Sequence, residues 1–216
     1  LQAEVSKLRV KPDVVVSLQN NGYKCFKDCK QIVYYHQSLP LYPGRYNLFK
    51  STERTLFNYK YIFPHIVKRT WTKDTQFVVQ TPVVKRRFVS YFGVPSANVH
   101  VCFPDIEKID VTLCKAYDWG DNRYHLMFVG DDSKYRNGCT LVKAMGLLKK
   151  KKSQLAENIT IHVTSSPEKA PIMYNEVLKN SVSDNFVFEG IIRHDNLLDF
   201  YKSATALVFP SSVETV

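Results

Sequence analysis

The chain lacks the long apolar runs, the dense cysteine pattern and the internal repeats that characterise several classes of protein. No apolar run approaches the roughly 18 residues of a membrane-spanning helix, which excludes such a helix. The five cysteines are scattered and odd in number, so reduced cytoplasmic thiols fit better than a secreted disulfide framework. Because Leu1 opens no signal segment and Val216 closes no helix, we expect an internal fragment of a longer protein.

Standard nucleotide-binding signatures are also missing. Neither the P-loop pattern nor the Gly-x-Gly-x-x-Gly spacing occurs, which disfavours an NTPase or a dinucleotide enzyme. Cys25, Cys29 and His36 could suggest zinc, but no second ligand pair follows at zinc-finger spacing. We therefore expect no metal and no other cofactor.

The composition of the 216 residues is that of a globular protein, with 44% hydrophobic and 23% charged residues. The net charge of +10 is uneven, because residues 1–110 carry a net +9 and residues 111–216 a net +1. The first half should therefore attract a polyanion such as nucleic acid, anionic lipid or a phosphorylated substrate, unless it is simply a soluble basic surface. A nucleic-acid-binding module is disfavoured because no recognised motif for it occurs and most aromatic residues fall in expected core elements.

Short apolar runs alternate with amphipathic segments along the chain. We predict strands at 13–18, 31–36, 77–80, 99–102, 124–129, 158–163, 186–188 and 206–209. The first of these is a β-branched run typical of a strand buried on both faces. We predict helices before Pro12, at 46–71 with a break near Pro64, and at 81–92, 139–150, 172–179 and 196–202. This α/β pattern predicts two Rossmann-like parallel-sheet lobes, 1–110 and 123–216, both incomplete and joined by a linker at 111–122.

Ligands of open parallel sheets bind beyond the carboxyl ends of the strands, and this rule selects four loops. His36 follows the second strand, where it could act as a base, orient a hydroxyl or simply cap a turn. The loop 130–138 brings a glycine, Arg136 and the start of a helix together, which suits a diphosphate, although a basic loop is often merely solvated. Gly190 could let a flat ring approach the backbone, or form an ordinary turn. Glu214 could bind sugar hydroxyls, or be a surface glutamate.

These segments together resemble one family. They are Ile-Val-Tyr-Tyr-His-Gln-Ser-Leu-Pro at 32–40, Phe-Val-Val-Gln-Thr at 77–81, Phe-Val-Gly at 128–130 with Tyr-Arg-Asn at 135–137, and Phe-Glu-Gly at 188–190. Asp-Phe-Tyr at 199–201 and Ala-Leu-Val-Phe-Pro-Ser-Ser-Val-Glu at 206–214 complete the pattern. Their order and spacing resemble those of the retaining, nucleotide-sugar-dependent glycosyltransferases of family 4, also called group 1, which have the two-lobed GT-B-type fold.

The resemblance implies roles for particular residues. The two residues implied in catalysis are Glu214 and His36. Glu214 matches the first glutamate of the family's paired-glutamate motif, which contacts the donor sugar, and His36 would lie on the acceptor side. Arg136 would bind the donor diphosphate. The other residues implied in donor binding are Gly130, Lys134 and Asn137 in the phosphate loop, and Gly190 and Ile191 beside the nucleotide base.

The phosphate loop departs from the family pattern in two places. Asp131 stands where members usually carry an arginine, and the usual lysine is Arg136 or, counted strictly, Asn137. The family resemblance implies sugar transfer from a nucleoside diphosphate to a hydroxyl of a saccharide or lipid-linked acceptor, in bacterial surface polysaccharide or glycolipid synthesis. It implies a cytoplasmic enzyme that needs no metal, that can lie peripherally on an anionic membrane and that has no nucleic-acid partner. A non-catalytic sugar-nucleotide binder, or another GT-B-type enzyme such as an epimerase or phosphorylase, remains the alternative.

Overall fold

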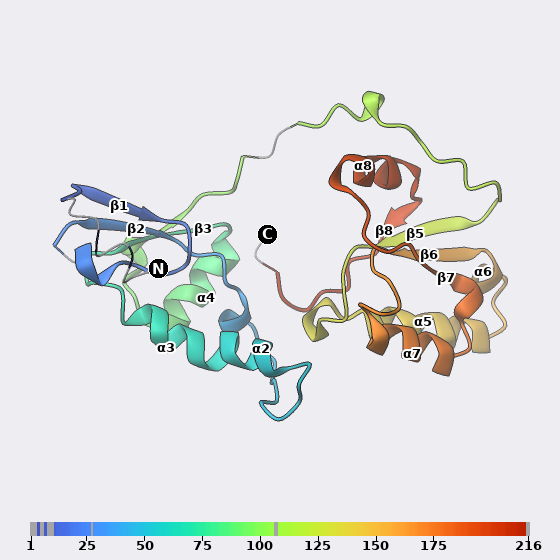
Figure 1. Cartoon of the computed structure of the whole chain (residues 1–216), viewed down its shortest axis with the longest axis horizontal. Coiled ribbons are helices and arrows are strands. Elements are labelled where there is room, and N and C mark those ends of the chain that lie inside the picture. The colour runs from blue at the N-terminus through green and yellow to red at the C-terminus, as the bar shows by residue number, and fades with distance from the viewer. Residues whose placement is uncertain (1–3, 5–6, 8–10, 27, 106–107, 215–216) are drawn as a thin grey trace. The chain divides into compact units, whose positions relative to one another are not determined.

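The computed structural model describes residues 4, 7, 11–26, 28–105 and 108–214, and the chain divides into two compact units. The first unit combines Leu1–Ile106 with Val213–Val216, and the second is Glu107–Ser212. Each unit contains a four-stranded parallel sheet with helices between its strands, which confirms the predicted fold class (Figure 1). The helix predicted before Pro12 falls largely outside the described residues.

The sheet of the first unit has the order β1-β2-β3-β4. Its strands are β1 (Val14–Ser17), β2 (Lys30–Tyr34), β3 (Gln76–Val79) and β4 (Val99–Val101). Ser17, Val33, Phe77 and Val99 are consecutive partners in the register, and all four are buried. This row of residues forms the core face of the sheet.

The expectation that β1 is buried on both faces is wrong. Val14 and Val16 are 46% and 60% exposed, whereas Ser17 on the opposite face is buried. Within the described residues β1 lies at the edge of its sheet, and α2 (Arg54–Phe57), α3 (Phe63–Lys68) and α4 (Pro82–Phe92) lie on one side of that sheet (Figure 1). β-Branched residues favour a strand because they fit a pleated, half-buried surface, and that preference alone does not place cover on both faces.

Helix α4 begins and ends at the predicted signals. The Thr81 hydroxyl accepts a hydrogen bond from the Val84 amide at 3.2 Å, Pro82 fills the first position, and Gly93 ends the helix with φ +68°. The buried face of α4 presents Phe88 to the core, where its ring centroid lies 4.7 Å from that of Tyr35. Edge-to-face and tilted contacts of this kind join Tyr35, Trp71, Phe77, Phe88 and Phe92 into one aromatic cluster.

The helix predicted at 46–71 is shorter than expected. Helical structure begins at Arg54, because the preceding residues form turns in which the Glu53 carboxylate accepts a hydrogen bond from the Asn47 amide at 2.9 Å. A π-helical turn, Asn58–Ile62, separates α2 from α3. It ends two residues before Pro64, whose missing N–H is tolerated in the first turn of α3, so the predicted break is present as a π-turn.

The second unit has the strand order β7-β6-β5-β8. Its strands are β5 (Tyr124–Phe128), β6 (Ile159–Val163), β7 (Phe186–Phe188) and β8 (Ala206–Leu207), and its helices are α5 (Gly138–Lys150), α6 (Gln154–Glu157), α7 (Pro171–Lys179) and α8 (His194–Ser203). Helices α5 and α7 cover one face of the sheet and α8 lies over the other (Figure 1). All five residues of β6 are buried, as expected for a central strand covered on both faces.

The segment 111–122, predicted as a linker, lies in the second unit and is fastened to α8. The Lys115 amide donates to Asp199 Oδ1 at 2.7 Å, and the Tyr117 amide donates to Ser203 Oγ at 2.6 Å. The Trp119 indole donates to the Ser203 carbonyl at 3.1 Å. We call residues 108–122 the docking segment, because these bonds hold them along the helix.

Candidate functional site

A cavity of about 570 Å³ lies in the second unit, beyond the carboxyl ends of β5 and β6. This volume is in the range of small-molecule sites. Three of the predicted donor-binding residues line the cavity, namely Gly130, Arg136 and Ile191. Residues that follow different strands therefore meet at one sheet edge, as the strand-end rule requires.

The loop between β5 and α5 is built around close packing on Phe128. A Cβ atom at Gly130 would lie 3.1 Å from the Phe128 ring, and one at Gly138 would lie 2.9 Å from the sulfur of Met173, so a larger residue at either position would require the neighbouring side chain to shift. Asn137 between them has φ +61°, and its Oδ1 accepts a hydrogen bond from the Thr140 hydroxyl at 2.7 Å. The side chain of Asn137, the residue that precedes α5, makes no capping hydrogen bond to the first amides of the helix. The positive end of this helix is therefore directed toward the loop.

Arg136 lies near two aromatic rings. Its guanidinium carbon is 5.3 Å from the ring centroid of Tyr135 and 5.9 Å from that of Phe209. The two segments are also joined by backbone contacts, because the Ser212 amide donates to the Tyr135 carbonyl at 2.8 Å and Asn137 Nδ2 donates to the Pro210 carbonyl at 3.2 Å. The structure thus brings the predicted phosphate loop against the segment that follows β8.

Two aspartates shape the same loop. Asp131, at the position where the family resemblance leads one to expect an arginine, lines the cavity and accepts a hydrogen bond from the Ser133 amide at 2.9 Å. Asp132 accepts hydrogen bonds from the amides of Ile172 and Met173, at 2.7 and 2.9 Å, and so caps α7. The departure at Asp131 therefore has a structural use as a turn-forming residue.

The loop after β7 closes another side of the cavity. The Glu189 amide donates to the Val163 carbonyl at 2.9 Å, and the Gly190 amide donates to the Ser165 carbonyl at 3.1 Å. Gly190 has φ +75°, and a Cβ there would meet no atom within 4 Å, so the requirement for glycine is conformational rather than steric. Ile191 projects beyond this turn and is 71% exposed.

The cavity also contains residues that the sequence analysis missed. Thr164, Ser165 and Lys169 follow β6 and line it. The strand-end rule applied to β6 would have found them, because β6 ends at Val163. Lys169 adds a second cation beside Arg136. Lys134 and Asn137 do not line the cavity, and they lie in the turn that leads to α5.

His36 lies in the first unit, two residues beyond the end of β2. Asn20 Oδ1 accepts hydrogen bonds from the backbone amides of His36 and Gln37, at 2.7 and 3.0 Å. This orientation directs the Asn20 amide nitrogen toward His36 Nε2, at 3.4 Å. Because the Asn20 nitrogen is a donor, Nε2 is the accepting nitrogen and the proton of the neutral ring is on Nδ1.

Lys60 was also missed, and it supports the same loop. Its ammonium group reaches from the π-turn to the carbonyl oxygens of Leu39 and Tyr42, and the contact with Leu39 is 3.2 Å. Partial burial lowers the pKa of Lys60. Glu214, the other predicted catalytic residue, is half-buried, follows the buried Val213 and is grouped with the first unit. Its contact with a donor sugar stays a prediction.

Two further properties concern the described residues as a whole. Among them, no group of three or more His, Cys, Asp and Glu side chains is arranged to hold a metal ion. No helix in the described ranges combines the length and apolarity needed to cross a membrane.

No family model and no curated protein sequence matches the chain, whereas solved structures do. WaaG, a glycosyltransferase involved in lipopolysaccharide biosynthesis, matches with a TM-score of 0.60 at 15% identity, over 97% of this chain and 56% of its own. Sucrose-phosphate synthase from Thermosynechococcus elongatus matches with a TM-score of 0.63 at 15% identity, over 99% of this chain and 54% of its own. The pneumococcal O-GlcNAc transferase GtfA, solved with UDP and GlcNAc, matches with a TM-score of 0.57 at 14% identity, over 99% of this chain and 40% of its own.

These similarities define the fold of the chain. Its two α/β units have the fold of the GT-B glycosyltransferases, and the chain spans between 40% and 56% of the length of the three matched proteins.

Proposed function

We propose that the protein is a retaining glycosyltransferase that moves a sugar from a nucleoside diphosphate to a hydroxyl group of a saccharide or lipid-linked acceptor. The observation that carries the proposal is the cavity in which Arg136, Lys169 and Gly130 meet beside the start of α5. Two cations and a helix N-terminus suit a diphosphate, and Ile191 suits the flat face of a base. The GT-B fold and the UDP named for GtfA agree with this ligand class.

The mechanism we propose follows from where charge develops. The diphosphate gains negative charge as the sugar leaves, and Arg136 with the first amides of α5 would stabilise it without reorganisation. Glu214 would contact the donor sugar. His36 would face the acceptor hydroxyl, with the tautomer set by Asn20. The biological setting we propose is bacterial surface polysaccharide or glycolipid synthesis.

One observation favours a second candidate. Asp131 places a carboxylate in the wall of the cavity, where it opposes binding of a diphosphate and would weaken transition-state stabilisation. A non-catalytic sugar-nucleotide binder would tolerate this loss. Binding of a sugar nucleotide without hydrolysis or transfer to any of a panel of acceptors would favour the non-catalytic protein.

The test is calorimetric titration of the chain with a panel of uridine and guanosine diphosphate sugars. Arg136→Gln should weaken binding about 10-fold or more, since a hydrogen bond to a charged group contributes about 1.5–3 kcal/mol. Lys150→Gln is the matched control, because it removes the same charge from the far end of α5, about 18 Å along the helix. Equal affinities for the wild type and Arg136→Gln would remove Arg136 from the site and leave the proposal without its main contact.

We also propose a cytoplasmic location with peripheral attachment to anionic membrane. The supporting observation is the 54–69 region, where Tyr59, Ile62 and Ile66 are 40%, 45% and 56% exposed. Arg54 and Arg69, at the two ends of this region, are also exposed. Apolar side chains flanked by cations are the usual composition of a helix that lies in a membrane surface.

A further inference from the structure

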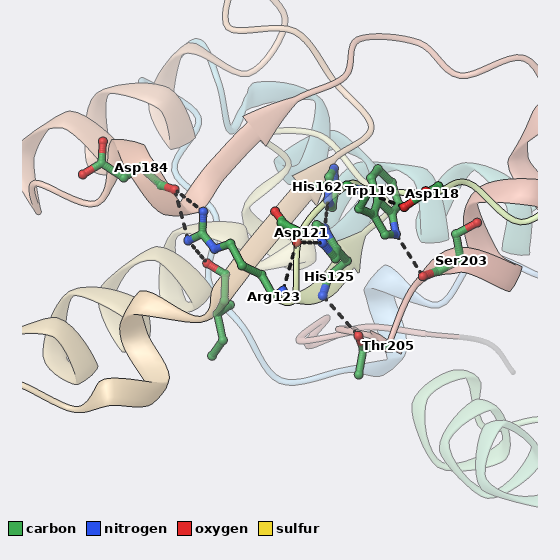
Figure 2. Close-up of polar contacts among 11 residues, drawn as sticks. Asp118, Trp119, Asp121, Arg123, His125, His162, Asp184, Ser203 and Thr205 are labelled. Carbon is green, nitrogen blue, oxygen red and sulfur yellow. Dashed lines mark hydrogen bonds and ion pairs between the residues drawn. The ribbon is translucent and has the colours of Figure 1, made fainter.

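Four titratable side chains form an unbroken hydrogen-bonded chain inside the second unit. Asp121 Oδ1 lies 2.8 Å from His125 Nε2, and His125 Nδ1 lies 2.9 Å from His162 Nε2 (Figure 2). His162 Nδ1 in turn lies 2.6 Å from Glu189 Oε1. This row of hydrogen-bonded side chains runs from the docking segment across β5 and β6 to the loop after β7, and neither the fold nor the proposed transfer mechanism accounts for it.

The two histidines at its centre are sealed from solvent. His125 and His162 are each 5% exposed. The indole of Trp119 contacts both, stacked on His125 with ring centroids 4.5 Å apart and tilted against His162 with centroids 4.2 Å apart. Trp119 is held in place by its hydrogen bond to the Ser203 carbonyl, so α8 and the docking segment close over the pair (Figure 2).

The geometry of the four side chains sets the number of protons that their three hydrogen bonds require. Three hydrogen bonds need three protons, but two neutral imidazole rings supply two, and two ionised carboxylates supply none. With only two protons, one contact would consist of two lone pairs facing each other. A third proton would complete the three hydrogen bonds, and if it is placed on the rings it would give the histidine pair one positive charge.

The surroundings favour that charge. Asp121 and Glu189 flank it, and the face of Trp119 offers a cation–π contact. Hydrogen bonds from the Arg123 backbone amide and, to a smaller extent, from the His125 ring hold the pKa of Asp121 below its usual value, so this carboxylate stays ionised. Four other charged groups on the elements around the pair have separate partners. Asp118 accepts from the Gly120 amide, and Arg123 donates to the Ile159 and Asp184 carbonyls. Asp199 accepts from the Lys115 amide, and Lys202 donates to the Cys114 carbonyl.

We propose that Asp121, His125, His162 and Glu189 form a proton-retaining relay, and that its third proton fixes the Glu189–Gly190–Ile191 turn at the cavity. His125 and His162 are then positioning residues. They act through Glu189, which directly precedes the residues proposed to contact the nucleotide base. The second half of this statement rests on the proposed function. Release of the third proton breaks one of the three bonds, and the turn and the docking segment lose their common attachment.

The first experiment counts ring protons. Histidine-labelled protein is studied by ¹⁵N–¹H NMR near neutral pH, and the two buried rings are identified by their proximity to the Trp119 indole. We expect three ring N–H protons on the pair near neutral pH, and two after one of them is lost as the pH is raised. Only two at every pH at which the protein is folded would overturn the relay.

Isosteric variants sharpen this count. In Glu189→Gln the new amide can donate a hydrogen bond to His162 Nδ1, so three bonds form with two ring protons. Glu189→Gln should therefore show two ring protons at the pH where the wild type shows three, while Asp118→Asn, the matched control in the docking segment, should keep three. Three protons retained in Glu189→Gln would refute the proposal.

The second experiment measures the affinity for UDP-glucose across pH, since its diphosphate does not titrate near neutrality. The wild-type affinity should fall several-fold over the pH range in which the third proton is lost, and that of Glu189→Gln should not change there. A wild-type affinity independent of this loss would refute the link to the turn. Failure of every sugar nucleotide in the calorimetric panel to bind at any pH would refute the proposed function and the link, while the ring-proton count would still decide the relay.

Discussion

Asn20 is the residue whose replacement tests how the loop of His36 is held. It has φ +66°, is 7% exposed, and accepts two backbone hydrogen bonds through one oxygen. Asn20→Ala loses both bonds, at about 0.5–1.5 kcal/mol each. It also places alanine in a left-handed conformation, at a cost of about 1 kcal/mol relative to asparagine. We expect the first unit to lose about 2–4 kcal/mol of unfolding free energy.

Two further variants separate these contributions. Asn20→Gly loses the hydrogen bonds but relieves the backbone, so it should be about 1 kcal/mol more stable than Asn20→Ala. Asn20→Asp keeps an accepting oxygen and the tolerance of positive φ, so the first unit should stay close to wild-type stability. It cannot donate to His36 Nε2, however, and the proton of the ring should move to that nitrogen.

The assay uses the two tryptophans of the chain, one in each unit. With 5-fluorotryptophan incorporated, the ¹⁹F signal of Trp71 reports urea unfolding of the first unit, and that of Trp119 is an internal control from the second. Only the Trp71 transition should move in Asn20→Ala. A change below about 0.5 kcal/mol, or an equal shift of both transitions, would refute the account of Asn20.

Two other outcomes follow from the first unit. The Tyr35 hydroxyl is buried and, among the described residues, has no hydrogen-bond partner, so Tyr35→Phe should keep or raise stability by up to about 1 kcal/mol. Burial, and to a smaller extent Tyr91, raises the pKa of Tyr35, so near pH 10 only the unfolded protein loses the Tyr35 proton. The unfolding free energy of the wild type should therefore fall above that pH. The unfolding free energy of Tyr35→Phe, measured by the same ¹⁹F signals, should fall less. Ile66→Glu should reduce co-sedimentation with anionic vesicles several-fold, whereas Leu147→Glu, an equally exposed apolar site in the second unit, should not; equal loss in both would contradict the membrane proposal.

The sequence was most informative where a local signal determines a local structure. Thr81, Pro82 and Gly93 delimit α4 because each acts within one turn of the helix. The strands were found in the same way, from short apolar runs. The start of α2 was not, since it depends on the turn contacts of Asn47 and Glu53 that precede it.

Long-range partners were beyond such signals. Asn20, in the loop after β1, contacts His36 in the loop after β2. Lys60 reaches the Leu39 carbonyl from a π-turn that no residue propensity predicts. His125 and His162 look like single histidines in apolar strands. They meet only because the register pairs Met127 with His162, which places His125 as a diagonal neighbour on the same face.

The uneven charge of the chain separates two kinds of recognition. Residues 1–110 carry a net +9, which acts over distances comparable to the screening length of about 10 Å at 0.1 M salt. The cavity of the second unit is lined by Arg136 and Lys169 against Asp131, so its selectivity depends on short contacts rather than on a broad field. Raising the salt concentration should therefore release the protein from anionic vesicles well before it weakens UDP-glucose binding. Parallel loss of both would mean that the cavity attracts its ligand by net charge, and that Arg136 makes no specific contact with the diphosphate.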